Sequence, residues 1–351
     1  MSNTEIHTTF KLNGISFNSI KELLAYTELE LPDAFEFFSE WFSSKKYLTV
    51  HTSGSTGKPK AIRLLKEHMI NSALTTSRYF ELDEERISAL LCMSPKYIAG
   101  KMMLVRAVIS GWELDVVEPA LNPLKQRKMY DFTAMVPLQV YHSLEDLHKV
   151  KTLIVGGGAV SNSLQKKLIT ARPRIYSTYG MTETVTHIAV KKINWLTGIT
   201  NYYEVLPGIT VEKDERDCLV INAPNISKKQ IITNDIVNVI DDTHFCWEGR
   251  FDNIINSGGV KIIPEKLEEK LDKNIDQRFF ISAVQDDALG QKVVLIIEGK
   301  KTSAIDFIGI HKYEVPKEIY YLDKFEETKT GKINRKKTFA KLLTVITKKQ
   351  K

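Results

Sequence analysis

The chain has 351 residues, of which 43% are hydrophobic and 26% charged, and its formal net charge is +6. This length exceeds the roughly 250–300 residues that one hydrophobic core usually supports, so two domains are expected. No apolar run approaches the roughly 18 residues of a membrane span, and the N-terminus lacks the basic start and apolar centre of a signal peptide. These features argue against membrane-spanning and secreted classes and predict a soluble, intracellular protein of the cytoplasm.

Cysteine usage and charge distribution narrow the classes of function further. Cys92, Cys218 and Cys246 have no metal-ligand spacing and form no disulfide framework, so buried, inert thiols are expected. Much of the positive charge lies beyond Lys332. A basic tail can contact nucleic acid, but a solvated helix end is favoured here, and a basic protein also suits a phosphate-rich small substrate.

The predicted elements begin with a strand hairpin in TFKLNGISF and one or two helices before residue 46. After a turn-rich segment at 51–60, KEHMINSALTTSRYF predicts a helix with one largely apolar face. That face comprises Met69, Ile70, Ala73, Leu74, Ser77 and Phe80. Strands are then predicted in ISALLCM, ELDVVEP, DFTAMVP, TLIVGGG and PRIYSTYG, and helices in AGKMMLVRAVISG and SNSLQKKLITA. This alternation predicts a mainly parallel sheet covered by helices.

From about residue 205 the pattern changes to hairpins of short strands, in ITVEKDERDCLVINAPN and IVNVIDDTHFCWEGR. DNIINSGGVKII predicts a hairpin with a Gly-Gly turn, and PEKLEEKLDK predicts a helix with proline at its first position. Strands in FFISAVQ and KVVLIIEG and a terminal helix in NRKKTFAKLLTVI follow. The predicted fold class is therefore α/β, with a large N-terminal domain and a small C-terminal α+β domain that meet near residue 250.

The first segment with chemical character is Thr52-Ser53-Gly54-Ser55-Thr56-Gly57-Lys58-Pro59-Lys60. Its glycines permit close backbone approach, its hydroxyl and N–H groups can cradle phosphate, and its lysines supply positive charge. It is not a Walker A loop, because Thr52 stands where the first glycine belongs and Pro59 follows Lys58. Alone, the segment fits a phosphate loop and a polar surface turn equally well.

A second motif, Tyr179-Gly180-Met181-Thr182-Glu183, follows a predicted strand directly. Ligands of open α/β sheets bind outside the carboxyl ends of the strands. An aromatic ring there can stack on a base, and a carboxylate there can hold a magnesium ion that bridges phosphates. Alone, a strand-end turn with a surface glutamate is the simpler interpretation.

Two more motifs follow towards the C-terminus. One is Gly249-Arg250-Phe251-Asp252, with Gly258-Gly259 and Pro264-Glu265 behind it. The other is Lys329-Thr330-Gly331-Lys332-Ile333-Asn334-Arg335. Each of them, taken singly, is compatible with a simple turn.

In this order the four motifs resemble the superfamily of adenylate-forming enzymes, which comprises acyl- and aryl-CoA ligases, peptide-synthetase adenylation domains and luciferases. The superfamily reads Thr-Ser-Gly-Ser/Thr-Thr-Gly-x-Pro-Lys, Tyr-Gly-x-Thr-Glu, Gly-Arg-x-Asp with Gly-x-x-Ile-x-Pro-x-Glu, and Gly-Lys-Ile-x-Arg. The matching residues are 52–60, 179–183, 249–265 with one swap, and 331–335. Weaker matches are Gly157-Gly158-Ala159, in the place of the adenine-binding loop, and Thr233-Asn234-Asp235, in the place of the ribose-binding Thr-Gly-Asp.

The resemblance implies ATP, Mg²⁺ and coenzyme A as cofactors. Residues 52–60 are then expected to hold the β- and γ-phosphates, with Thr56 beside the metal. Tyr179 is expected to stack on adenine, Thr182 to bind the α-phosphate and Glu183 to ligate magnesium.

The resemblance also implies two half-reactions. Asp235 and Arg250 are expected to bind ribose, and Asp252 to be the hinge between residues 1–250 and a mobile domain, 253–351. Lys332 is expected to bridge the substrate carboxylate and the α-phosphate. After adenylation the small domain rotates, and Gly258-Gly259 then lines a thiol channel. No general base is needed, because the attacking carboxylate is already ionised, so cations and N–H donors carry the catalysis.

The chain departs from the superfamily at three places. Members usually carry a much longer segment before the phosphate loop, which implies a trimmed N-terminal subdomain here. Asn234 replaces the glycine of Thr-Gly-Asp, and Glu265 stands one place early in the Pro-x-Glu signature, although Glu268 is present.

Within the superfamily the chain is most similar to the o-succinylbenzoate–CoA ligases of menaquinone biosynthesis. Ser94-Pro95-Lys96-Tyr97-Ile98-Ala99-Gly100 resembles their Pro-Leu-Phe/Tyr-His-x-Ser-Gly segment, which implies that Tyr97 or its neighbour gates the acid pocket. Because such a substrate has a second carboxylate, a basic residue is expected deep in the site. The candidates are Lys101 first, His187 second and Arg106 third, with exposed helix positions and a satisfied strand histidine as the alternatives.

Two rival functions remain open. The protein could load an aryl acid onto a carrier protein instead of coenzyme A, or it could be a non-catalytic nucleotide-binding regulator. Intact Glu183 and Lys332 argue against the regulator. The expected partners are small molecules, without nucleic acid, and the expected state is a monomer or homodimer.

Overall fold

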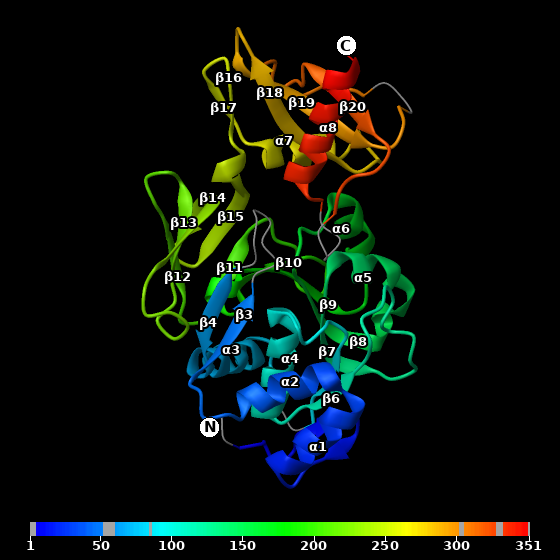
Figure 1. Ribbon diagram of the computed structural model, residues 1–351, viewed down its shortest axis with the longest axis vertical. Coiled ribbons are helices and arrows are strands. Elements are labelled where there is room, and N and C mark those ends of the chain that lie inside the picture. The colour runs from blue at the N-terminus through cyan, green and yellow to red at the C-terminus, as the bar shows by residue number, and fades with distance from the viewer. Residues whose placement is uncertain (1–4, 52–59, 84–85, 302–304, 328–332, 350–351) are drawn as a thin grey trace.

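The computed structural model describes residues 5–51, 60–83, 86–301, 305–327 and 333–349. Its larger part carries the N-terminus, and a smaller part at the other end of the long axis carries the C-terminus (Figure 1). No helix in these ranges is both long and apolar enough to cross a membrane.

The chain begins with the predicted hairpin and helices. The hairpin pairs β1 (Lys11–Leu12) with β2 (Ile15–Ser16), and α1 (Ile20–Glu30) and α2 (Pro32–Trp41) follow. The Ser19 hydroxyl caps α1 by accepting the N–H of Glu22 at 3.2 Å, and Pro32 starts α2, where its missing N–H has no helical partner to lose.

A large sheet forms the centre of the molecule. Its strand order is β12-β13-β14-β15-β11-β10-β9-β8-β7-β5-β6-β1-β2. The parallel part comprises β1, β5 (Ser88–Leu91), β6 (Glu113–Val116), β7 (Tyr130–Met135), β8 (Val150–Val155) and β9 (Arg174–Gly180). Its covering helices are α3 (Lys66–Tyr79), α4 (Ile98–Ser110), α5 (Pro137–His142) and α6 (Asn162–Leu168).

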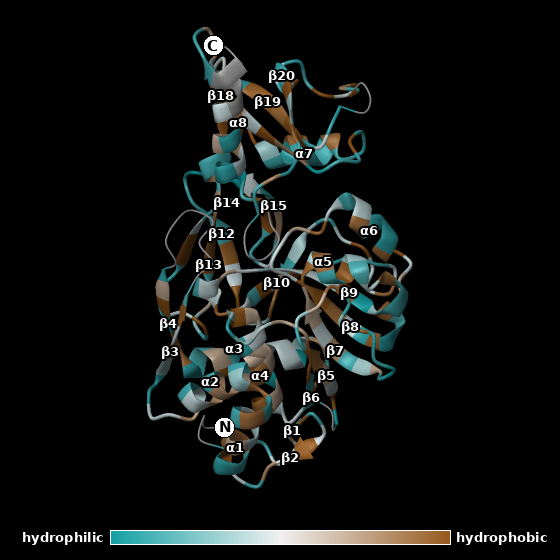
Figure 2. Ribbon diagram, turned by 45° about the vertical axis from the view of Figure 1, so that its right-hand side comes forward, coloured by the Kyte–Doolittle hydropathy of each residue, from teal (hydrophilic) through white to brown (hydrophobic). Residues whose placement is uncertain are grey.

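Two cores lie on opposite faces of the parallel strands, because successive side chains of a strand alternate between faces. Ile154 and Tyr176 point into the core that contains residues of α2, α3 and α4. Leu153 and Ile175, their neighbours in sequence, point into the core built with α5 and α6. Figure 2 shows hydrophobic residues gathered along these central strands.

Antiparallel strands continue the same sheet beyond β9. They are β10 (His187–Lys192), β11 (Tyr203–Val205), β12 (Thr210–Lys213), β13 (Cys218–Asn222), β14 (Ile231–Asp241) and β15 (His244–Arg250). A separate hairpin pairs β3 (Tyr47–His51) with β4 (Ala61–Leu65). The parallel pairing expected for the first strands and the hairpins expected from about residue 205 are therefore both present. The structure joins them into one sheet, in which the described pairs beyond β9 are antiparallel.

The smaller part has a sheet of its own, with the order β17-β16-β19-β18 and with β20 beside β19. Its strands are β16 (Ile255–Ser257), β17 (Val260–Ile262), β18 (Phe279–Asp286), β19 (Gly290–Glu298) and β20 (Glu318–Leu322). Helix α7 (Pro264–Leu271) contributes to a core on one face, and α8 (Arg335–Lys349) to a core on the other. The predicted α/β fold with a small C-terminal α+β unit is confirmed.

Candidate functional site

The β3–β4 hairpin brings two of the sequence motifs together. His51 pairs with Ala61, so the predicted phosphate loop joins two paired strand ends. Of that loop only Lys60, which is exposed, lies within the described residues; 52–59, including Thr56 and Lys58, lie outside them. Strand β4 packs against the single turn η2 (Thr182–Thr184), so the start of the hairpin's return strand lies beside the Tyr-Gly-x-Thr-Glu motif.

That motif occupies the carboxyl end of β9 and turns sharply. A Cβ at Gly180 would lie 2.4 Å from the carbonyl oxygen of Thr186, so no side chain fits there. The buried Thr184 hydroxyl accepts the N–H of Met181 at 2.9 Å and lies 2.7 Å from the carbonyl oxygen of Thr186. These bonds hold the carboxylate of Glu183 in an exposed position at the sheet edge.

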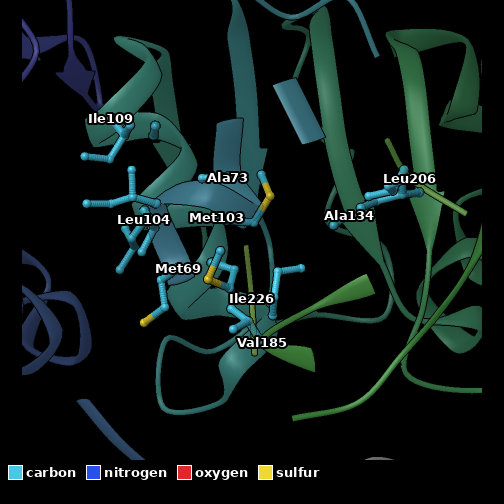
Figure 3. Close-up of a cluster of buried hydrophobic side chains, with 14 of the residues drawn as sticks. Met69, Ala73, Met103, Leu104, Ile109, Ala134, Val185, Leu206 and Ile226 are labelled. Carbon is cyan, nitrogen blue, oxygen red and sulfur yellow. The ribbon is translucent and has the colours of Figure 1, made fainter. Parts of the chain in front are cut away.

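Val185 adopts an uncommon backbone conformation directly after η2. Its φ is 65° and its ψ is −57°, and the N–H of Thr186 donates to the carbonyl oxygen of Thr184 at 2.7 Å. This is a γ-turn with positive φ at its centre, a strained form that is very rare for a β-branched residue. Only 1% of Val185 is exposed, and Figure 3 shows its side chain among Met69, Met103 and Ile226. Core packing therefore holds the turn that local preference disfavours.

Glu183 fits a magnesium ligand. Mg²⁺ commonly binds one or two carboxylates together with waters and substrate phosphates. The described ranges contain no cluster of three or more His, Cys, Asp or Glu residues that could hold a metal ion. A metal ion at Glu183 would therefore need ligands from a bound molecule or water. A single exposed carboxylate at the carboxyl end of β9 is compatible with a magnesium ion that is bound mainly through phosphates and waters.

The predicted nucleotide residues converge on Asp235, which is 6% exposed. Its carboxylate accepts the Tyr179 hydroxyl at 2.6 Å and the Trp247 indole N–H at 3.3 Å, and it lies 3.4 Å from the Arg250 guanidinium. Burial, and then the charge of Asp235, raises the pKa of Tyr179, so the hydroxyl stays protonated. Asp235 and Arg250 come from adjacent strands in direct register.

The predicted adenine loop lies at the same edge. Gly157, with φ 74°, follows the end of β8, and a Cβ at the preceding Gly156 would lie 2.6 Å from the Thr178 hydroxyl of β9. Gly157 and Ala159 are exposed, and Gly158 is half-buried. Backbone at the ends of two neighbouring parallel strands is thus available to a ligand.

The predicted hinge residue has two partners in the larger part of the molecule. Asp252, in the turn η3 (Phe251–Asn253), accepts from Arg250 at 3.3 Å and from the side-chain amide of Asn234 at 3.3 Å. Asn234 in turn accepts from Arg216 at 3.0 Å. Asn234, which stands where the superfamily has glycine, therefore donates a hydrogen bond that restrains Asp252.

Arg106, the third basic candidate, is deeply buried. It is 1% exposed in the middle of α4, and within the described chain no carboxylate lies close enough to form an ion pair with it. One Nη donates to the Thr186 hydroxyl at 3.2 Å, and the Nε has no partner. Burial lowers the pKa of Arg106 to about 10, which leaves the guanidinium charged at neutral pH.

His187 completes this buried cluster. Its Nδ1 lies 3.3 Å from the Thr186 hydroxyl, while its Nε2 is buried without a partner. Burial, and then the charge of Arg106, holds the pKa of His187 well below its ordinary value, so the ring is neutral. A buried cation beside an orphaned imidazole nitrogen lacks an anion, and a substrate carboxylate is one group that would supply it.

Lys101 has different surroundings from those expected for a pocket lysine. It is half-buried at the start of α4, its ammonium lies 5.5 Å from the centre of the Phe37 ring, and it faces the acidic residues of α2. Burial lowers the pKa of Lys101, and Glu40 and Glu36 oppose that shift. Among the three basic candidates, Arg106 is therefore the charged side chain that is buried without an ion-pair partner in the described part of the chain.

The remaining predicted residues are spread over both parts of the molecule. Tyr97 is 42% exposed and caps α4, and a Cβ at Gly100 would lie 2.3 Å from the Ser94 carbonyl oxygen. Gly258 (φ 57°) and Gly259 (φ 82°) form the two-residue turn between β16 and β17, as predicted. Lys332 lies outside the described residues.

Sequence reasoning missed two participants, Trp247 and Val185, whereas the segment that begins at Thr186 was expected to line the acid pocket. Val185 stands two residues after the Tyr-Gly-x-Thr-Glu motif, and its role depends on a turn that local pattern does not indicate. The burial of Arg106 could have been predicted, because apolar residues flank it on both sides in MMLVRAVI.

Comparisons with known proteins agree with this geometry. Residues 40–211 match the family of AMP-binding enzymes. A 2-succinylbenzoate–CoA ligase of Geobacillus sp. (strain WCH70) is 24% identical over 352 residues, which cover 87% of this chain and 71% of that protein. Its counterpart in Staphylococcus epidermidis is 26% identical over 379 residues, covering 95% and 77%.

Solved structures share the fold. The crystal structure of an "acyl-CoA synthetase (AMP-forming)/AMP-acid ligase II-like protein" from Dyadobacter fermentans is 35% identical, with a TM-score of 0.62, and the match covers 92% of this chain and 98% of that one. The o-succinylbenzoate CoA synthetase (MenE) of Bacillus subtilis, in complex with the acyl-adenylate intermediate OSB-AMP, has a TM-score of 0.71 at 18% identity. That match covers 82% of this chain and 68% of the other.

Proposed function

This chain belongs to the family of AMP-binding enzymes, and from that membership we propose that it activates a carboxylic acid with ATP and transfers the acyl group to coenzyme A. The substrate carboxylate attacks the α-phosphorus of ATP, the bond to pyrophosphate breaks, and an acyl-adenylate forms. The coenzyme A thiol then attacks the acyl carbon, AMP leaves, and a thioester results.

The acid that we propose is o-succinylbenzoate, which has two carboxylates. Curated relatives are named for this substrate, and one observation in this chain carries the proposal. Arg106 is a buried, unpaired cation within hydrogen-bonding distance of Thr186, three residues beyond Glu183. An isolated buried charge is strongly disfavoured, and a bound carboxylate compensates for it. One carboxylate of the acid would meet ATP while the second meets Arg106.

His187 would support the same contact without adding charge. Its neutral ring can turn an N–H towards an oxygen of the second carboxylate, since Nε2 has no partner among the described residues. A monocarboxylic fatty acid would leave Arg106 unpaired, so the site disfavours it.

Several of the chain's residues would orient ATP for in-line attack. Tyr179 and Asp235, bonded at 2.6 Å, would border the adenosine, with Asp235 and Arg250 at the ribose hydroxyls. Glu183 would ligate Mg²⁺, which neutralises phosphate charge when bound. Lys332 would bridge the attacking carboxylate and the α-phosphate and stabilise the charge that develops there.

The placement of the smaller part suits the first half-reaction. The start of α8, which follows Lys332 in sequence, lies towards the large sheet, whereas the turn between β16 and β17 lies at the far end of the molecule (Figure 1). We propose that residues 253–351 rotate about Asp252 between the half-reactions, which would exchange the two segments.

A panel of acids tests the proposal, scored by pyrophosphate release with and without coenzyme A. The panel contains o-succinylbenzoate, its analogue with one carboxylate replaced by an amide, benzoate and a long-chain fatty acid. The expected result is fastest release with o-succinylbenzoate and turnover to a thioester with free coenzyme A. Preference for the fatty acid would reject the substrate. Adenylate formation without thioester formation would favour a carrier protein as the acceptor.

A further inference from the structure

A bidentate ion pair crosses the edge of the small sheet. The Arg335 guanidinium, at the start of α8, donates to both carboxylate oxygens of Glu268 on α7, at 2.8 and 2.6 Å. One of those oxygens also accepts the N–H of Ile281, at 2.7 Å, from the edge strand β18. The two helices contribute to cores on opposite faces of this sheet, so the pair joins them around its edge.

The same guanidinium is linked to the hinge. Glu265 lies 3.8 Å from Arg335 and accepts the side-chain amide of Asn253 at 2.6 Å. Asn253 follows Asp252 directly and closes the turn η3. A hollow on the surface is lined by residues 252–255 together with Arg335 and Lys336, so the hinge and the start of α8 are neighbours.

The pair also stands at the base of the segment that carries Lys332. Glu327 and Ile333, which flank residues 328–332, pair in an antiparallel bridge. The N–H of Asn334 donates to the Glu326 carbonyl at 2.7 Å. Arg335 is three residues beyond Lys332, which is at most about 10 Å of extended chain.

We propose that Glu268 and Arg335 are positioning residues for adenylate formation, holding the base of the Lys332 segment in a fixed relation to the hinge through Glu265 and Asn253. This inference rests on the catalytic role proposed for Lys332. When the hinge is set for adenylation, the network would place the lysine at the α-phosphate.

Stability alone does not account for this pair. Both side chains are only partly buried, with Arg335 34% and Glu268 16% exposed, and a partly exposed ion pair contributes about 1 kcal/mol or less. The two carboxylates share a single guanidinium, and one oxygen of Glu265 is buried without any partner. Burial raises the pKa of Glu268, although Arg335 opposes that shift. These costs are consistent with a network whose role is to fix the positions of α7, the start of α8 and the hinge relative to one another.

Two variants of the enzyme separate positioning from folding. Glu268→Gln leaves Arg335 without its bidentate partner. Glu268→Gln combined with Arg335→Met removes the charge from both and still leaves an oxygen for the N–H of Ile281. Glu314→Gln is the matched control, because it breaks another α7 ion pair, with Lys270 at 2.6 Å, that has no link to the hinge.

The expected result is a split between half-reactions. Both variants should form adenylate about 10- to 100-fold more slowly, because a displacement of about 1 Å at a reacting group costs about that much. Thioester formation from preformed adenylate should stay within about twofold, and the double variant should regain the melting temperature that the single variant loses. Glu314→Gln should change neither rate. Equal loss in both half-reactions, or a double variant that regains adenylation along with stability, overturns the proposal.

A second readout needs no activity. The amide protons of Asn334 and Thr338 should exchange with solvent at least about tenfold faster in the double variant, while those of β19 stay protected. Unchanged exchange at Asn334 also overturns the proposal, whatever the enzyme does. In a Lys332→Ala background the double variant should slow adenylation no further. If Lys332→Ala itself leaves adenylation intact, the proposed role of the lysine fails. The exchange result still shows whether Glu268 and Arg335 hold the start of α8 in place.

Discussion

Arg106→Met is expected to make the protein more stable and its reaction with o-succinylbenzoate slower. Burial lowers the pKa of Arg106 from 12.5 to about 10, which corresponds to about 3 kcal/mol against the charged form. Because this folded-state pKa lies below the unfolded value, the whole destabilisation is present below about pH 10 and is relieved only above it. An assay at neutral pH therefore measures it in full.

The stability gain is reduced by the contacts that are lost. The hydrogen bond to Thr186 contributes about 1 kcal/mol, and methionine fills most of the vacated space with an apolar, flexible chain. A net stabilisation of about 2 kcal/mol follows, visible as a rise of a few degrees in melting temperature. Ordinary core truncations move stability in the opposite direction.

The kinetic effect should depend on the second carboxylate. Removing one partner of a buried charge pair costs about 2–5 kcal/mol, so kcat/KM for o-succinylbenzoate should fall by about a hundredfold or more. The KM for ATP and the rate with the monoamide analogue should change little. Lys101→Met, on the same helix but facing α2, is the control and should leave the KM for the acid nearly unchanged.

One outcome would refute this reasoning directly. If Arg106→Met melts at a lower temperature and loses activity equally with the diacid and its monoamide, the guanidinium is a structural group. If Lys101→Met raises the KM for the diacid instead, the lysine, and not the arginine, receives the second carboxylate.

Further variants test the remaining parts of the site. Glu183→Gln should keep the melting temperature, since the side chain is exposed, and slow pyrophosphate release about a hundredfold; near-native release would remove Glu183 from the metal site. Lys332→Ala should slow adenylate formation by about a hundredfold and spare thioester formation from preformed adenylate, so equal impairment of both would contradict domain rotation. Gly259→Leu should spare adenylate formation, because a Cβ there meets nothing within 4 Å in this orientation. It should block the thioester step, because the new side chain would stand in the expected thiol channel; loss of both steps would mark the turn as structural. Asn234→Gly should speed domain rotation a few-fold, measured by fluorescence transfer between labels on the two parts, by removing one bond to Asp252; an unchanged rate would show that this bond does not restrain the hinge.

Much of the fold was predictable because its elements have strong local patterns. The helix from Lys66 to Tyr79 shows its buried face in sequence, and the Gly-Gly hairpin at 258–259 has both residues at positive φ. The hairpins from about residue 205 were predicted, but their place in the large sheet was not, since the pairing of β10 with β9 and of β15 with β11 is not indicated by local pattern. Strand β20, short and largely half-buried, has no clear alternation.

The site was predictable in its motifs and not in its surroundings. Tyr179, Asp235 and Arg250 were all expected at the nucleotide, and the structure places Tyr179 and Arg250 each in contact with Asp235. Lys101 and Arg106 were ranked by their places along one helix, and the structure gives the two side chains different neighbours. The neighbours that distinguish them, α2 for Lys101 and Thr186 for Arg106, come from segments distant in sequence.

The strained turn at Val185 has a consequence for the order in which the protein folds. A conformation of this kind costs about 1–3 kcal/mol, so the chain has no reason to adopt it before the core is built. The residues that surround Val185 belong to α3, α4 and the segment near Ile226 (Figure 3). Residues 181–187 should therefore reach their native shape only after these distant segments have met. The active site would be among the last parts of the large sheet to form, and the first to be lost when that core loosens.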